Sequence, residues 1–143
     1  MLTQGEADAL MTMRKRFTEL RAIAMDPGVD STHELVSDDE QEQFLLDIWR
    51  GTFRLSKLRL QERARKVIVL VRLDIDGSPH TNPDGVHLGG THLHTYREGY
   101  EDKWAEPIDR AVFTNPADPE VAFRQFCGFC NIAQAPPVQG SLL

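Results

Sequence analysis

Four of the five histidines in this 143-residue chain lie within fifteen residues of one another. They are His80, His87, His92 and His94. Histidine titrates near neutral pH and often ligates metals, so such a cluster suits proton transfer or metal binding. In a strand, His92 and His94 would project from one face, about 6–7 Å apart, so both imidazoles could reach one cation or one phosphate. A solvated sheet face would show the same alternation, and the pattern alone leaves both interpretations open.

Phosphodiester chemistry is the first hypothesis for this segment, and it describes a small nuclease or toxin. In this hypothesis His92 and His94 act as general acid and base, with His80 assisting. Arg97 and Lys103 stabilise the charge of the phosphate. The residues expected to bind the substrate, RNA or DNA, are Asn82, Asp84, Tyr96, Tyr100, Arg54, Lys57 and Arg59. This chemistry requires no metal or other cofactor.

Binding of a divalent metal ion is an alternative for the same segment. Its expected ligands are His80, His92, His94 and Asp84, because imidazole nitrogens and carboxylate oxygens are common ligands of such ions. The turn HTNPDG would hold His80 and Asp84 in place, since Asn before Pro is extended and Asp-Gly favours a tight turn. A His-x-His spacing occurs in many proteins without a metal, so it is a weak indication alone.

Two blocks of opposite charge follow each other in the chain. Residues 30–47 contain seven Asp or Glu and no Lys or Arg, whereas residues 50–72 contain eight Lys or Arg and one Glu. The interpretation we favour is that the blocks face each other or are solvated. The alternative is a non-enzymatic phage or mobile-element inhibitor that binds a host or defence protein through the acidic block. A toxin would instead have an antitoxin as its protein partner.

A longer motif surrounds the histidines. The sequence HTNPDG at 80–85 is followed by GTHLHTYREGYEDKWAEPI at 90–108. This segment resembles an uncharacterised family of small bacterial and phage-borne proteins with the pattern HxNPDG, then HxHxYREGYxDKWA. The resemblance implies no activity. It implies that the family's site consists of His80, Asn82, Asp84, His92, His94, Tyr96, Arg97, Glu98, Tyr100, Lys103 and Trp104. His87 lies outside the pattern.

Cys127 and Cys130 form a CGFC motif near the end of the chain. Redox and zinc sites use this spacing, but a redox motif stands at the start of a helix, and a zinc site needs two more ligands. Here the motif lies inside an apolar helical stretch. We therefore interpret the two cysteines as small residues that pack the last helix.

The spacing of apolar residues and the capping residues predict the helices and strands that position these side chains. Helices are predicted at residues 3–24, with a Thr3–Glu6 capping box, at 37–51, and at 119–132. Alternation predicts an antiparallel hairpin of 53–61, with a bulge near Lys57, and 67–75, followed by strands at 91–97 and 111–114. The predicted fold class is α+β: two N-terminal helices, a mainly antiparallel sheet of three or four strands, and one C-terminal helix.

Composition restricts the class of protein. Hydrophobic residues make up 41% and charged residues 27%, and the net charge of −6 argues against a protein that coats nucleic acid. No apolar run is long enough to span a bilayer, and the first residues lack a signal-peptide core, so we expect a cytoplasmic protein without membrane contact. We predict a single domain over residues 1–135 and a poorly ordered tail over 136–143.

Overall fold

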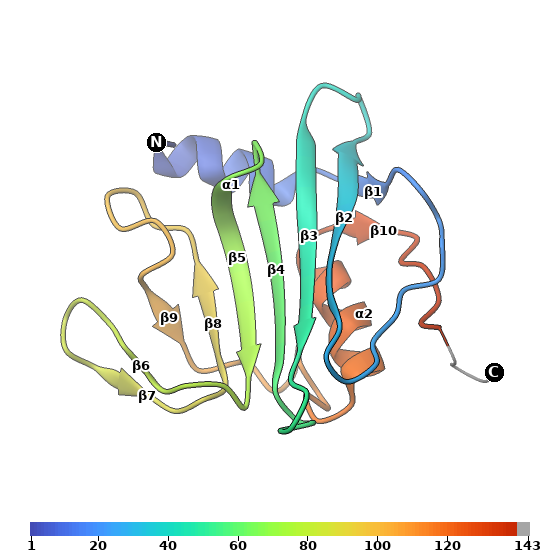
Figure 1. Ribbon diagram of the computed structural model, residues 1–143. Coiled ribbons are helices and arrows are strands. Elements are labelled where there is room, and N and C mark those ends of the chain that lie inside the picture. Colours follow the sequence, from blue (N-terminus) through green and yellow to red (C-terminus); the bar gives the residue numbers. More distant parts are fainter. Residues whose placement is uncertain (140–143) are drawn as a thin grey trace.

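The fold is dominated by one large sheet (Figure 1), in a computed structural model that describes residues 1–139. Its strands are Lys15–Phe17 (β1), Asp30–Ser37 (β2), Gln43–Arg50 (β3), Leu58–Ala64 (β4), Ile68–Ile75 (β5), His92–Thr95 (β8), Ala105–Glu106 (β9) and Ile132–Ala133 (β10). Within the described residues these eight strands pair in the order β10-β1-β2-β3-β4-β5-β8-β9. A separate hairpin pairs His80–Thr81 (β6) with His87–Leu88 (β7). All neighbouring pairs are antiparallel except β1 with β10.

The predicted fold class is wrong, because the chain is mostly β and has one N-terminal helix instead of two. The first helix, α1, covers only Gln4–Thr12. The Thr3–Glu6 capping box is present as predicted, but the chain leaves the helix at Met13 and enters β1. The apolar residues Phe17 and Ile23, which had extended the predicted helix, reach the core from a strand and an isolated bridge.

The second predicted helix is strand β3. Phe44, Leu46 and Ile48 alternate as buried residues, whereas Leu45 is only partly covered on the other face. A short run such as FLLDIW satisfies both periods, so its pattern cannot decide between helix and strand. Pairing with β2 on one side and β4 on the other decides for the strand.

The later elements follow the predictions more closely. Strands β4 and β5 form the predicted antiparallel hairpin, although its irregularity lies between Glu62 and Arg63 rather than near Lys57. The second helix, α2, covers Pro119–Phe129 with Asp118 as its N-cap. Residues 111–114 form no strand, contrary to the prediction.

The core lies between one face of the sheet and the two helices. In Figure 1, α1 and α2 lie behind the sheet, and no helix covers the front face. The fully buried side chains include Phe44, Leu46, Ile48, Leu60, Leu73, Phe123 and Phe126. The side chains that alternate with these buried residues along each strand therefore point to the front face. On that face, a row of directly paired residues runs across five strands. This row consists of Asp30, Trp49, Arg59, Asp74 and His92.

The acidic and basic blocks partly neutralise each other. Asp47 pairs with Arg63 at 2.7 Å between Oδ2 and Nε. Glu42 pairs with Arg65 at 3.2 Å. These contacts join adjacent segments of the sheet, which agrees with the interpretation that the two blocks face each other.

The end of the described chain returns to the sheet. The amide of Ile23 donates to the carbonyl of Pro137, and the amide of Gln139 donates to the carbonyl of Ile23. The rest of the predicted tail, 140–143, lies outside the described residues. Neither of the helices within residues 1–139 has the length and apolar character to cross a membrane.

Candidate functional site

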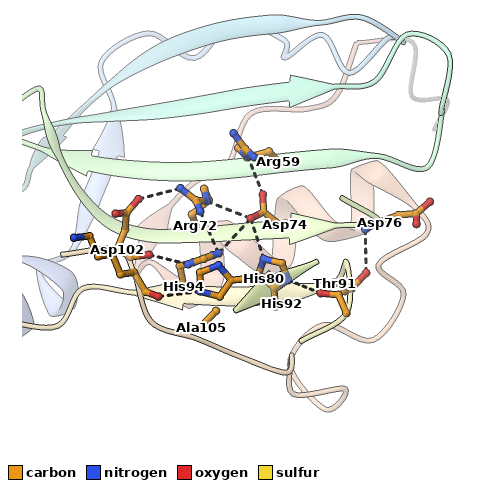
Figure 2. A network of polar contacts seen from close by, with 12 residues as sticks. Arg59, Arg72, Asp74, Asp76, His80, Thr91, His92, His94, Asp102 and Ala105 are labelled. Atoms are coloured by element: carbon orange, nitrogen blue, oxygen red, sulfur yellow. Dashed lines mark hydrogen bonds and ion pairs between the residues drawn. The ribbon is translucent and has the colours of Figure 1, made fainter. Parts of the chain in front are cut away.

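Strands β5 and β8 bring two pairs of polar side chains together on the front face of the sheet (Figure 2). Asp74 lies opposite His92, and Arg72 lies opposite His94. Residues two apart in a strand share a face, so the four side chains form one cluster. The two imidazoles and the carboxylate are buried, with relative exposures of 2% for His92, 1% for His94 and 6% for Asp74.

Backbone carbonyls fix the orientation of the histidine rings. Nδ1 of His92 contacts the carbonyl oxygen of Gly89 at 2.7 Å, and Nδ1 of His94 contacts that of Asp102 at 2.8 Å. A carbonyl oxygen can only accept, so each Nδ1 carries a hydrogen. In the neutral form, Nε2 of both rings then holds a lone pair.

These lone pairs converge on a carboxylate. Nε2 of His92 lies 3.2 Å from Oδ2 of Asp74, and Nε2 of His94 lies 3.4 Å from the same oxygen. The three ligand atoms lie within 4.8 Å of one another. Burial lowers the pKa of His92, assisted by the charges of its histidine neighbours, and this outweighs the carbonyl of Gly89 and the charge of Asp74. Near neutral pH, His92 therefore presents an acceptor nitrogen to an acceptor oxygen.

Two arginines from neighbouring strands surround Asp74. Arg59 donates through Nε to Oδ1 at 2.8 Å, and Arg72 donates through Nε to Oδ2 at 3.2 Å. Burial by itself would raise the pKa of Asp74, but hydrogen bonding to the carboxylate and the positive charges of Arg72 and Arg59 outweigh it and hold the pKa well below its ordinary value. Asp74 is thus ionised at any physiological pH.

Arg72 also connects the cluster to the loop before β9. Its Nη2 lies 3.1 Å from Nε2 of His94, to which it donates, and its Nη1 donates to Oδ2 of Asp102 at 2.9 Å. Arg72 is therefore the cation that occupies the acceptor side of His94 in this structure.

The third histidine of the cluster comes from the β6–β7 hairpin. The ring centroid of His80 lies 4.6 Å from that of His94 and 5.6 Å from that of His92. Nε2 of His80 donates to the carbonyl of Lys103 at 2.9 Å, which leaves Nδ1 with the lone pair when the ring is neutral. His80 thus lies beside the buried pair, as the sequence hypothesis expected.

Asn82 fixes the hairpin that carries His80. Its Nδ2 donates to the carbonyl of Ala105 at 2.8 Å, and its Oδ1 accepts from the amide of Ala105 at 2.9 Å. Asn82 is 8% exposed, so these bonds are shielded from water. Both polar groups of the Asn82 side chain are therefore engaged with the backbone of Ala105, which holds the hairpin in place.

Replacing Asn82 by alanine is expected to lower the free energy of unfolding by about 1–3 kcal/mol, because two buried backbone groups of Ala105 lose their partner. Denaturant unfolding measures this. Asn82→Asp keeps the acceptor but turns a carboxylate oxygen toward the carbonyl of Ala105, so it is expected to lose at least as much. Unchanged amide exchange across residues 80–88 in Asn82→Ala would contradict a role in holding the hairpin.

Several predicted site residues lie away from the cluster. Tyr96 turns to the opposite side, where its hydroxyl donates to the carbonyl of Leu2. Arg97 is exposed and lies 4.2 Å from the ring of Trp104. Tyr100 meets the edge of the same ring. The contact of Tyr96 joins the end of β8 to the N-terminus, and the other two contacts lie within the loop after β8.

Other predicted residues have local partners. Asp84 accepts from the amide of Val86 in the β6–β7 turn and lies outside the three-residue ligand group. Lys103 is exposed and contributes its backbone carbonyl to His80. Arg54 pairs with Asp76, and Lys57 lies 5.4 Å from the ring of Trp49.

Sequence reasoning missed Asp74, Arg72 and Asp102. The sequence does contain a signal for the first two. Arg72 and Asp74 are two residues apart in a strand, like His92 and His94, so each pair shares one face. The pairing of β5 with β8, which the sequence does not specify, places one pattern beside the other.

Cys127 and Cys130 are buried and free. Burial raises the pKa of Cys127 to about 12 and that of Cys130 well above its ordinary value, so neither thiol forms a reactive thiolate near neutral pH.

Comparison with known sequences places most of the chain in one group. The model of a family of unknown function (DUF6978) matches residues 2–132. The chain belongs to this family. No curated protein and no solved structure matches the chain significantly. DUF6978 membership confirms the expectation of an uncharacterised family, and it attaches no activity to the histidine cluster.

Proposed function

We propose that this DUF6978 protein binds a divalent transition-metal ion through Oδ2 of Asp74 and Nε2 of His92 and His94. The observation that carries the proposal is the convergence of three acceptor atoms, two of them on rings whose other nitrogen is already committed to a carbonyl. Facing acceptors repel each other in a buried site unless a cation lies between them. Arg72 meets this requirement at Oδ2 of Asp74 and Nε2 of His94, and a metal ion would meet it at all three atoms, Nε2 of His92 included.

The surroundings of the ligands support a metal. Histidines that ligate metals generally donate their second ring nitrogen to a carbonyl or carboxylate, which fixes the tautomer. His92 and His94 both do so. Two imidazoles and one carboxylate suit zinc and other first-row ions, and three protein ligands leave a position for water.

The open position favours a hydrolytic role over a purely structural one. A metal ion of this class lowers the pKa of bound water and so supplies a nucleophile at neutral pH. His80 lies beside the ligand pair with its Nδ1 free to accept a proton. We therefore assign His80 the role of a proton acceptor next to the metal.

The test is metal content and melting of chelator-treated protein on addition of Zn²⁺, Mn²⁺ or Ni²⁺. We expect about one ion per chain, and stabilisation of about 2.7 kcal/mol at a hundredfold excess over the dissociation constant. His92→Gln is expected to weaken binding at least tenfold. His87→Ala is the matched control, because His87 is exposed in the β6–β7 hairpin and contacts Thr81 instead of the cluster. Equal metal content in wild type and His92→Gln would refute the site.

Metal-independent cleavage of phosphodiesters, by a nuclease or toxin of a mobile element, is the second candidate. The position of Arg59 and Arg72 next to the histidines favours it, since guanidinium groups stabilise phosphate charge. The burial of His92 and His94 weighs against it, because acid–base groups must reach the scissile bond. RNA cleavage that persists in excess chelator and disappears in His94→Gln would favour this candidate over the metal centre.

A further inference from the structure

The charges around the histidines balance only in the absence of a metal. Arg59 and Arg72 contribute two positive charges in direct contact with the cluster, and Asp74 and Asp102 contribute two negative charges. A divalent ion bound by Asp74, His92 and His94 would therefore add an uncompensated charge of about +2 to this group. A partly buried site of this charge needs an anionic partner.

Arg59 has donors to offer such an anion. Its Nε is used by Asp74, but neither terminal nitrogen makes a hydrogen bond within residues 1–139. The side chain is 51% exposed, whereas the carboxylate it holds is 9% exposed. Arg59 thus extends from the buried ligand group to the surface, with the forked end of its guanidinium directed to solvent. A guanidinium fork matches the oxygens of phosphate and carboxylate groups.

Arg72 is placed to become the second donor. A metal at Nε2 of His94 would remove the acceptor of Arg72 Nη2, which lies 3.1 Å away. The ion pair of Nη1 with Asp102, at 2.9 Å, would keep the guanidinium next to the site. Metal binding would therefore free an N–H group of Arg72 next to His94.

The depth of the ligand group restricts the shape of the anion. His92 and His94 are almost fully buried, and the β6–β7 hairpin that carries His80 packs against them. The backbone of a polymer cannot pass over atoms at this depth, whereas Arg59 reaches from this depth to the surface and could hold a terminal group. A terminal phosphate carries a charge close to −2 at neutral pH, as the site requires, and an internal diester carries only −1.

We infer that the metal-loaded site binds the dianionic phosphate of a phosphomonoester through the ion, Arg59 and Arg72. This inference rests on the proposed metal centre. Trp49 is the cross-strand partner of Arg59 on the same face, and its half-buried ring offers a flat surface for the organic part of the ester. The substrate class is thus a small phosphomonoester rather than the internal phosphodiesters expected from the sequence.

The test uses zinc-loaded full-length protein and three probes: inorganic phosphate, p-nitrophenyl phosphate and bis(p-nitrophenyl) phosphate. Calorimetric titration is expected to show binding of the first two and at least tenfold weaker binding of the diester. Removal of zinc by chelator is expected to abolish binding. Arg59→Gln, loaded to one zinc ion per chain as checked by metal analysis, is expected to weaken monoester binding at least tenfold. Its zinc affinity is measured separately, because Arg59 also holds the carboxylate of Asp74.

Arg54→Gln is the matched control, because Arg54 is an exposed arginine paired with an aspartate on the neighbouring loop. It should bind phosphate as wild type does. Stoichiometric zinc without phosphate binding, equal affinity for diester and monoester, or equal losses in Arg59→Gln and Arg54→Gln would each overturn this inference and leave the metal centre standing. Absence of zinc binding would overturn the metal centre, and the inference with it.

Discussion

Replacing Lys15 by methionine is expected to lower the free energy of unfolding by about 3–5 kcal/mol near pH 8, because it leaves a buried carboxylate without its partner. Lys15 and Glu62 are both fully buried, with 3.1 Å between Nζ and Oε1. Nζ also donates to the carbonyls of Met11 and Cys130. One ammonium group thus joins β1 and β4 to the ends of both helices. Equilibrium denaturation in urea measures the loss.

A double variant separates the charge from the packing. Lys15→Met/Glu62→Leu removes both charges, so no ion is left unpaired, and it is expected to be more stable than Lys15→Met alone. It should remain below wild type, because the carbonyls of Met11 and Cys130 still lack their donor. A double variant no more stable than Lys15→Met would show that the lost carbonyl bonds, and not the unpaired carboxylate, account for the effect.

Glu62 contributes to the free energy of unfolding of the wild-type protein through its raised pKa. This contribution is expected to fall by about 3 kcal/mol as pH rises from 4.5 to above 7. Burial raises the pKa of Glu62 to about 7 despite the opposing charge of Lys15. Its Oε2 has no hydrogen-bond partner among the described residues, which adds to the cost of ionisation. The folded state binds the proton more tightly than the unfolded chain, so the contribution is complete below the unfolded pKa of 4.5. It is lost as pH rises through the folded value.

Glu62→Gln isolates this contribution, since glutamine keeps the shape and cannot ionise. Between pH 4.5 and 8, wild type should lose about 3 kcal/mol of unfolding free energy relative to Glu62→Gln. Other titrating groups, including His33 with its lowered pKa, affect both proteins and cancel in the difference. A difference that is constant with pH would mean that Glu62 is ionised throughout.

Local patterns predicted the elements whose signals lie in adjacent residues. The Thr3–Glu6 capping box marks the start of α1, and the predicted start of the last helix at Pro119 is confirmed. The run VIVLVRLDI of β5 is rich in Val, Ile and Leu and indicates a strand, and its hairpin with β4 needs only a short turn. In each of these cases the stabilising contacts lie close in sequence, so the sequence is sufficient to predict them.

Where a segment meets both periods, only tertiary pairing decides its structure. The run FLLDIW in β3 would give a helix with an apolar face, but hydrogen bonds to β2 and β4 on both sides make it a strand. The end of α1 at Thr12 has the same origin, because Lys15 is drawn into the core by Glu62, 47 residues away. A propensity of a few tenths of a kcal/mol per residue cannot compete with such contacts.

The candidate site divides in the same way. The sequence by itself determined that His80, His92 and His94 belong together, since a stiff turn and a two-residue spacing lie within fifteen residues. Only the tertiary structure decided that Asp74 lies beside His92 and His94 and that Tyr96 and Arg97 make their contacts elsewhere. The physical reason is that pairing of β5 with β8 sets which side chains share a face. That register depends on contacts across the whole sheet rather than on neighbouring residues.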